Sequence, residues 1–259
     1  MKKYNILISN DDGINGPGLK PLMKELSSFA NIYVIVPKHE MSGTSHSIHL
    51  KKYLKLEKIR HNIYALVGGT PADCVKYALY SFFKDKIDLV VSGINTCANL
   101  AQDVVYSGTV ASAREGAYLG IPSMSVSASD ETNPCYNQVA KAALKIAKEV
   151  LKKEKKGRPA LCLNINIPPN YKGIKVVPLG IRCYDETIVE KKTKKGTYYK
   201  LAGRFISGKK NKNSDIDAIE QGFISITPLE LDQTSFSKIK KYKFLECCSR
   251  KSYNNNFTS

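Results

Sequence analysis

Segments with a strand pattern alternate with segments that have a helix pattern through the first two-thirds of the chain. A short apolar run at 4–9 is followed by 18–29, where apolar residues recur every three or four positions. The first pattern is typical of a buried strand and the second of an amphipathic helix. Strands that alternate with helices in this way form parallel sheets covered on both faces. We therefore expect an α/β fold with a doubly wound, mostly parallel sheet.

The expected elements follow from this alternation. Strands are predicted at residues 4–9, 31–36, 49–56, 63–67, 87–92, 123–127, 160–167 and 175–177. Helices are predicted at residues 18–29, 70–83, 109–119 and 137–153. We place the core domain at 1–180, because the pattern changes after that point.

A smaller C-terminal region is predicted at 181–259. It opens with two β-rich segments inside 182–205, joined by a lysine-rich turn. A lone ribbon of two strands with few apolar residues is marginal in water, so we expect it to pack on another subunit. The chain is expected to return to the core at about 215–248, and the polar tail at 249–256 to be frayed.

The tetrad Asn10-Asp11-Asp12-Gly13 directly follows the first predicted strand. Ligands of open α/β sheets bind at the carboxyl ends of the strands. Two carboxylates about 4 Å apart repel by roughly 4 kcal/mol at an effective dielectric near 20, and a bound divalent ion turns this repulsion into attraction. Oxygen ligands favour Mg²⁺ or Mn²⁺. The alternative for the tetrad is an ordinary turn in which an aspartate caps the next helix.

Three further polar clusters are expected at the same edge of the sheet, at 37–47, 92–99 and 106–109. Each has a simple structural alternative: a serine-rich linker, a turn asparagine or a helix N-cap. Together they supply carboxylates, an amide oxygen and a hydroxyl for a hard metal, beside a helix start that can hold an anion. This combination is what a metal-dependent phosphate-ester hydrolase needs.

Composition limits the other classes of site and partner. The seven cysteines are odd in number and form no C-x-x-C pair, and the four histidines show no H-x-x-x-H or H-E-x-x-H pattern. We therefore expect free thiols and no zinc site. The formal charge of +17 favours anionic partners. Because the lysine clusters lack interleaved aromatic residues, a solvated surface is favoured over a dedicated nucleic-acid site.

The apolar stretches are too short to cross a bilayer. No charged and then apolar leader precedes Tyr4. We expect no membrane partner and a cytoplasmic location.

The ordered motifs resemble the SurE family of metal-dependent nucleotide phosphatases. The matching residues are Ser9 to Gly13, Pro37 with Ser42-Gly43 and His46 to Ile48, Gly69 to Val75, Ser92 to Asn95 with Ala98 to Leu100, Tyr106 to Val110, and Ser225 to Leu229. The resemblance implies a Rossmann-like core and a C-terminal hairpin that subunits exchange to form a homodimer or homotetramer. It also implies hydrolysis of nucleoside 5'-monophosphates, and of 3'-monophosphates and polyphosphate as further substrates.

The resemblance also implies roles for single residues. One divalent metal ion, Mg²⁺ or Mn²⁺, is expected on Asp11, Asp12, Ser42 and Asn95, with the two aspartates as catalytic residues. The phosphate-binding residues are expected to be Asn10, Gly43, Ser107, Gly108 and Thr109. Ser42 as a covalent nucleophile is less favoured, since no histidine base can be placed beside it. For His46, orienting its loop and a purely structural role are both open.

The chain departs from the family at three positions. The family usually has glycine where this chain has Cys97, Ala101 and Ala111. A positive φ at Cys97 would strain the loop that carries Asn95, whereas the two alanines are expected to matter less.

The sequence also bears on two other functional classes. A dinucleotide-dependent oxidoreductase is disfavoured, because Gly13-x-x-Gly16-Pro17-Gly18 is not G-x-G-x-x-G and two carboxylates would repel a pyrophosphate. The main alternative is a basic nucleic-acid-binding protein without catalysis, whose binding would fall steeply with salt.

Overall fold

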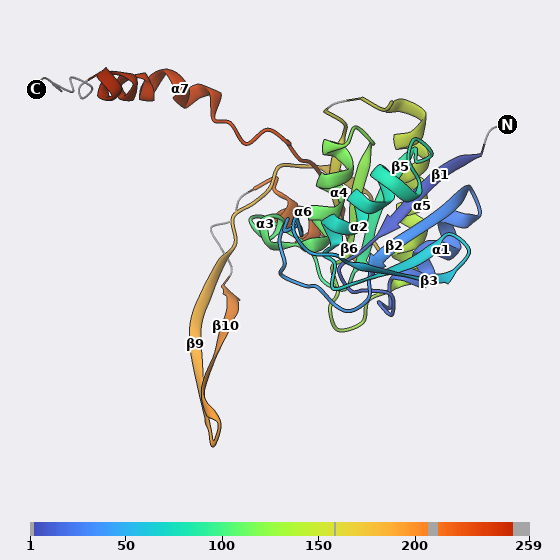
Figure 1. Cartoon of the computed structure of the whole chain (residues 1–259), viewed down its shortest axis with the longest axis horizontal. Coiled ribbons are helices and arrows are strands. Elements are labelled where there is room, and N and C mark those ends of the chain that lie inside the picture. Colours follow the sequence, from blue (N-terminus) through green and yellow to red (C-terminus); the bar gives the residue numbers. More distant parts are fainter. Residues whose placement is uncertain (1–2, 158, 207–211, 251–259) are drawn as a thin grey trace, which may run out of the picture. The chain divides into compact units, whose positions relative to one another are not determined.

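A computed structural model of the protein describes residues 3–157, 159–206 and 212–250 (Figure 1). The contacts divide the chain into two units, Met1–Leu229 and Glu230–Ser259. Each is described by itself. The domain boundary expected near residue 180 stays a prediction.

The first unit holds the strands and most of the helices. Its strands are β1 (Tyr4–Ser9), β2 (Ala30–Pro37), β3 (Lys55–Arg60), β4 (Ile63–Val67), β5 (Leu89–Asn95), β6 (Ser123–Ala128), β7 (Cys162–Ile167), β8 (Ile174–Val176), β9 (Cys183–Thr193), β10 (Gly196–Ile206) and β11 (Ile224–Pro228). Its helices are α1 (Leu19–Ser27), α2 (Pro71–Tyr77), α3 (Asp103–Tyr106), α4 (Gly108–Tyr118), α5 (Tyr136–Lys153) and α6 (Asp215–Glu220), and a π turn, Ala78–Phe82, follows α2.

Nine strands form one sheet in the order β3-β4-β2-β1-β5-β6-β7-β11-β8. The six strands from β4 to β7 are parallel to their neighbours, while β3 and β11 pair antiparallel with β4 and β7. The chain winds outward from β1 through β2 and, on the other side, from β5 through β6. The point between β1 and β5 is therefore the switch point, where ligands of such sheets bind. The prediction of a doubly wound, mostly parallel sheet is confirmed.

Two apolar layers enclose the sheet. Ile6 and Ile8 pack with residues of α1 and α5 on one face, and Leu7 packs with residues of α2 on the other. Alternate residues of a strand point to opposite faces, so a strand with helices on both sides needs an unbroken apolar run. Residues 6–8 provide such a run, which places the following tetrad at the edge of the sheet.

The strands β9 and β10 pair only with each other, in antiparallel register from Gly196 opposite Thr193 to Ile206 opposite Cys183. Figure 1 shows them side by side as a long ribbon. Ile188, Tyr199 and Leu201 are each at least 60% exposed on it. The hairpin expected from the sequence is present. Its exchange between subunits stays a prediction.

Some predicted elements differ from those observed. The strand predicted at 49–56 is wrong for most of its length, since β3 begins at Lys55 and Leu50 and Tyr53 are largely exposed. Alternating residues mark a strand only where a neighbouring backbone can pair with them. The helix predicted at 70–83 loses its α geometry after Tyr77. The short α3 and the helix α6, which lies within a segment expected to resume the core, were not predicted as helices.

The second unit contains α7 (Phe236–Tyr242) and the 3₁₀ helix Lys243–Arg250. The frayed tail predicted at 249–256 falls mostly outside the described residues. In the part of the chain that the structure describes, no helix combines the length and apolar character needed to cross a membrane.

Candidate active site

The tetrad after β1 forms a tight turn. Asn10 closes it with two hydrogen bonds: its Nδ2 donates to the Gly13 carbonyl at 3.0 Å, and its Oδ1 accepts from the Gly13 N–H at 3.1 Å. Gly13 has φ +81°, a conformation that glycine adopts without steric cost. Both functional groups of the Asn10 side chain are thus occupied within the turn. Its predicted role as a phosphate-binding residue stays a prediction.

Asp11 is buried, with 3% of its surface exposed. Its Oδ1 accepts a hydrogen bond from the Thr109 hydroxyl. Burial raises the pKa of the Asp11 carboxyl, and the bond from Thr109 opposes this rise. The carboxylate also lies against the first residue of α4, because a Cβ at Gly108 would come within 2.8 Å of Asp11 Cβ and 3.1 Å of Oδ2. A carboxylate beside a helix N-terminus is stabilised by the helix dipole.

Asp12 has a carboxylate oxygen without a visible partner. Among the described residues, its Oδ2 is buried and accepts no hydrogen bond. Burial raises the pKa of Asp12 to about 6, and the negative charges of Asp11 and Glu40 add to the rise. Gly16 lies close beneath it, since a Cβ there would come within 2.6 Å of Asp12 Cβ. An unpaired buried carboxylate is costly, so this oxygen invites a cation or a proton.

The loop after β2 brings Ser42 to the same region. The Met41 N–H donates to the Asp11 carbonyl at 2.7 Å. Ser42 is exposed, and its hydroxyl donates to Glu40 Oε1 at 2.9 Å. Gly43 has φ +71° and open space around it. The negative charge of Glu40, the partner of Ser42, contributes to the raised pKa of both aspartates.

Asn95 ends β5, the strand next to β1, where Ser9 is in register with Ser92. Its Nδ2 donates to the Cys97 carbonyl at 2.7 Å, which leaves the amide oxygen as the group available to an ion. The neighbouring Thr96 forms a side-chain hydrogen bond that lowers the pKa of Asp12. Thr96, the residue after Asn95, therefore links the end of β5 to Asp12.

The expected strain at Cys97 is absent and occurs instead at Ala101. Cys97 does not belong to the described non-glycine residues with positive φ, whereas Ala101 has φ 54°. Ala101, rather than Cys97, is therefore the departure that stands in a backbone conformation favouring glycine, while the prediction that the two alanines matter less stays a prediction. The Ala101 N–H donates to Asp215 Oδ2 at 2.8 Å, and this bond holds the residue in the left-handed region. Ala111 lies within α4 and is buried.

The predicted anion-binding segment begins α4. Ser107 is its N-cap, and its hydroxyl accepts from the Val110 N–H at 3.1 Å. The side chain of Thr109 is directed to Asp11. Both hydroxyls thus have structural partners, so an anion here would bind through the backbone N–H groups at the helix start. The phosphate-binding role of Ser107, Gly108 and Thr109 stays a prediction.

Sequence reasoning did not find a buried acidic residue on α4. Glu115 accepts hydrogen bonds from His46 at 2.8 Å and from Lys76 at 2.7 Å. Burial raises the pKa of Glu115, but the bonds from His46 and Lys76 outweigh it and leave the pKa lowered. His46 therefore ties the Ser42 loop to α4. No local sequence signal indicated this role, because the partners of Glu115 come from other segments of the chain.

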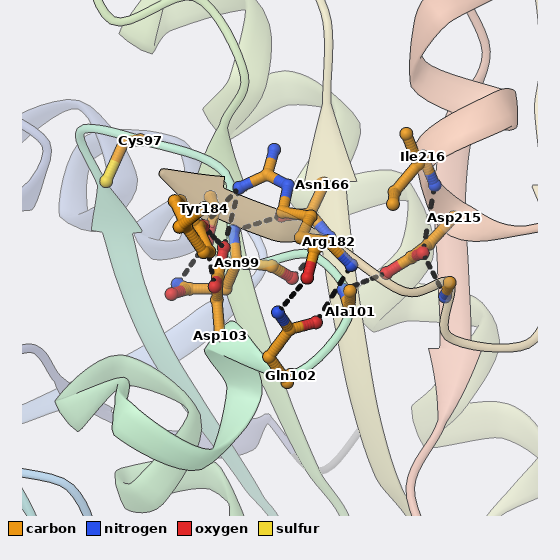
Figure 2. A network of polar contacts seen from close by, with 12 residues as sticks. Cys97, Asn99, Ala101, Gln102, Asp103, Asn166, Arg182, Tyr184, Asp215 and Ile216 are labelled. Carbon is orange, nitrogen blue, oxygen red and sulfur yellow. Dashed lines mark hydrogen bonds and ion pairs between the residues drawn. The ribbon is translucent and has the colours of Figure 1, made fainter. Parts of the chain in front are cut away.

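A second network missed from the sequence lies below the loop after β5. The Asn99 N–H donates to Asn166 Oδ1 at 2.8 Å, and Asn164 Nδ2 donates to the Asn99 carbonyl at 2.7 Å. Figure 2 shows Asn99 beside Asn166, and Ala101 beside Asp215. Buried amides with satisfied partners fix a backbone firmly. The sequence signal that could have indicated this network is the pair of asparagines that alternate with apolar residues in β7.

The oxygen atoms gathered here fit a hard cation better than a soft one. In the described part of the chain, no group of three or more His, Cys, Asp or Glu residues could hold a metal ion. A cation at this edge would thus use the two carboxylates with neutral oxygens from Ser42 and Asn95, a donor set that suits Mg²⁺ or Mn²⁺. The partnerless Oδ2 of Asp12 agrees with such a ligand position.

The fold and site together define an α/β protein with a paired-aspartate site at the switch point of its sheet. The model of the family described as survival protein SurE matches residues 6–186. The chain belongs to the SurE family.

Two relatives and one solved structure extend the match to nearly the whole chain. The protein named 5'-nucleotidase SurE from a Nitratiruptor species is 37% identical over 254 residues, which cover 92% of this chain and 98% of that protein. The protein of the same name from Aquifex aeolicus is 38% identical over 93% of this chain and 97% of its own length. The crystal structure of the SurE protein from Aquifex aeolicus superposes with a TM-score of 0.83, at 37% identity, and covers 93% of this chain and 99% of that one.

Proposed function

We propose that the protein is a divalent-metal-dependent 5'-nucleotidase that hydrolyses nucleoside monophosphates to nucleoside and phosphate. The observation that carries this proposal is the pair Asp11 and Asp12 at the switch point, where Asp11 is buried and the buried Oδ2 of the half-buried Asp12 has no partner among the described residues. The names of the SurE relatives support the nucleotidase activity.

The metal would be held by Asp11, Asp12, Ser42 and Asn95, which follow or end the strands β1, β2 and β5. When bound, such an ion neutralises phosphoryl oxygens and lowers the pKa of a coordinated water.

The remaining roles in the reaction are assigned to residues of the chain itself. Asp11 is fixed by Thr109 and by the start of α4, so we assign it an orienting role. Asp12 lacks such a partner on Oδ2, so one oxygen of this carboxylate would bind the cation and the other would accept the proton of an attacking water. The N–H groups at the start of α4 would hold phosphoryl oxygens as negative charge develops, and Gly43 offers an unhindered backbone on the facing loop.

The substrate range is proposed to extend beyond 5'-monophosphates. The formal charge of +17 creates a field that attracts anions, which supports 3'-monophosphates and polyphosphate as further substrates. The same charge favours the alternative, a nucleic-acid-binding protein without catalysis. A homodimer or homotetramer formed through the hairpin is part of the proposal, because a second subunit would cover its exposed apolar residues. The cytoplasmic location stays a prediction.

The test is phosphate release from AMP and GMP with Mn²⁺ or Mg²⁺, before and after addition of EDTA. We expect release that stops with EDTA and returns with added metal. Asp12→Asn should lower kcat by about 10²- to 10⁴-fold, the range for a positioned acid–base group. Asp85→Asn is the matched control: Asp85 is an exposed aspartate in a turn that precedes β5, and its φ of 60° is one that asparagine tolerates.

Two results would overturn the proposal. Equal phosphate release with and without EDTA would refute the metal dependence. Wild-type activity in Asp12→Asn would refute the role of Asp12 as proton acceptor. Salt-sensitive binding of DNA or RNA without any phosphate release would support the alternative instead.

A further inference from the structure

A cleft of about 600 Å³ lies between α3 and the base of the hairpin. Its walls include Gln102, Asp103 and Tyr106 from the first side and Tyr184, Glu186 and Leu201 from the second. The volume falls within the range of about 300 to 1,000 Å³ that is typical of small-molecule sites. Nothing in the proposed hydrolysis of the phosphate ester uses this space.

The cleft adjoins the candidate active site through the backbone. Tyr106 ends α3 and directly precedes Ser107, the N-cap of α4. The next residue, Gly108, lies against Asp11. From the other direction, the Ser45 N–H donates to the Tyr106 carbonyl at 3.0 Å, so the Ser42 loop also reaches this wall. A substrate whose phosphate lies at the start of α4 would extend its remaining part toward Tyr106.

The hairpin side of the cleft is held in place by polar contacts. The Arg182 guanidinium donates to Asp103 Oδ2 at 2.6 Å, and the Tyr184 hydroxyl lies 2.8 Å from each Asp103 oxygen. The Arg182 N–H donates to Gln102 Oε1 at 2.9 Å. Figure 2 shows these four residues as one connected group. Ordered walls lower the cost of binding, because fewer groups must be fixed when the ligand arrives.

The chemistry of the walls suits an uncharged aromatic group. Tyr106 and Tyr184 are both partly exposed and line the cleft together with Leu201. The carboxylates of Asp103 and Glu186 also line it, and the charge of Asp103 is paired with Arg182. Aromatic side chains bind nucleobases by stacking, which contributes about 1–3 kcal/mol per base.

Two other cavities lie elsewhere in the described structure. One is lined by Leu79, Lys84 and Ile87, and Ile87 precedes the first residue of β5. The other involves Met23, Ile32 and Arg60, and Ile32 lies near the start of β2. Both therefore lie near the amino ends of parallel strands, away from the aspartate pair at the carboxyl ends.

We infer that the cleft between α3 and the hairpin base binds the nucleoside part of the substrate, with the base against Tyr106. This inference rests on the proposed nucleotidase function. It makes Tyr106 a residue that selects nucleotides over other phosphate esters.

The test compares AMP with p-nitrophenyl phosphate, an ester that carries no nucleoside, under the same metal conditions. Tyr106→Ala should lower kcat/KM for AMP at least about 10-fold more than it lowers kcat/KM for p-nitrophenyl phosphate. Tyr106→Phe should keep most of the selectivity, because it keeps the ring. Tyr53→Ala is the matched control, since Tyr53 is fully exposed in a different loop, and it should change neither value.

Binding of the product gives a second measurement. Adenosine should inhibit hydrolysis of p-nitrophenyl phosphate by the wild type competitively, and Tyr106→Ala should weaken this inhibition by a similar factor. If Tyr106→Ala fails to fold, Leu201→Ser on the opposite wall provides the same comparison.

The outcomes separate the two proposals. If the wild type releases no phosphate from either ester, the proposed function fails. If it hydrolyses both and Tyr106→Ala lowers both values equally, with unchanged inhibition by adenosine, the inference about the cleft is overturned while the function stands.

Discussion

Thr109 donates its hydroxyl hydrogen to Oδ1 of Asp11, a residue 98 positions earlier in the chain. Both residues are buried. The bond joins the end of β1 to the first turn of α4 and therefore fixes one aspartate of the pair. The other aspartate keeps a carboxylate oxygen without a partner in the described structure. This difference between two neighbouring residues of the same type is the basis for assigning them different roles.

The first prediction concerns this hydroxyl. Thr109→Val keeps the shape of the side chain but removes the donor, so Asp11 loses a bond that opposes the rise of its pKa. We expect kcat/KM for AMP to fall about 10- to 100-fold, as for other partners of metal-binding side chains. Thr109→Ser should recover most of the activity, because it restores the hydroxyl. Equal activity in Thr109→Val and the wild type would contradict the assigned role.

The second prediction concerns Gly108, which leaves no room for a side chain. An added Cβ would come within 2.8 Å of Asp11 Cβ and 2.9 Å of Pro71 Cγ. Gly108→Ala should lower the free energy of unfolding by about 1–3 kcal/mol through overpacking, although alanine is the better helix former. Urea denaturation measures the change. Gly157→Ala is the control, since nothing lies within 4 Å of its Cβ position, and a loss as large in this variant would exclude the steric cause.

The third prediction concerns the pH dependence of stability at Glu115. Its folded pKa lies below the ordinary value of 4.5, so the folded protein binds the proton more weakly than the unfolded chain does. The stabilisation is fully present above about pH 4.5 and is lost as the pH falls through the folded pKa. Glu115→Gln should therefore cost about 1–3 kcal/mol at pH 6, and this cost should shrink toward pH 3.

Chemical denaturation at several pH values between 6 and 3 measures this difference. A constant gap between the wild type and Glu115→Gln over the whole range would show that the bonds to His46 and Lys76 do not depend on the charge of Glu115.

The fourth prediction concerns the exposed apolar residues of the hairpin. Ile188 and Leu201 are directly opposite each other on β9 and β10, and they are 60% and 65% exposed. Patches of this kind mark interaction surfaces. Ile188→Asp should shift the protein from a dimer or tetramer toward a monomer in size-exclusion chromatography with light scattering. Tyr53→Asp places the same charge outside the hairpin and should leave the mass unchanged. A monomeric wild type would refute the oligomer.

Much of the central sheet could be predicted because its strands are continuous apolar runs that the sequence shows directly. Residues 6–8 are all fully buried, and a run that is apolar on both faces has few alternatives to a central strand. The position of the tetrad at the carboxyl edge follows from this strand. The position of Asn95 at the same edge as the tetrad follows in the same way, because Asn95 ends β5, the parallel neighbour of β1.

The parts that could not be predicted depend on contacts between distant segments. Glu115 and His46 are 69 positions apart, and no local pattern connects them. The φ of 54° at Ala101 is unfavourable for alanine in isolation, and it is held by the bond to Asp215. Tertiary contacts of this kind override local preference, and a single sequence does not reveal them.

The bond between Ala101 and Asp215 also determines the order in which the molecule can be completed. A chain leaves the ribosome from its amino end, and its segments fold as they appear. Both aspartates of the site emerge early, but the loop that follows Asn95 lacks its anchoring carboxylate until α6 has been synthesised. A truncated product that ends at the hairpin would carry every proposed metal ligand and still lack the carboxylate that holds Ala101 in the loop after Asn95. Nascent enzyme would thus become competent only when translation is almost finished.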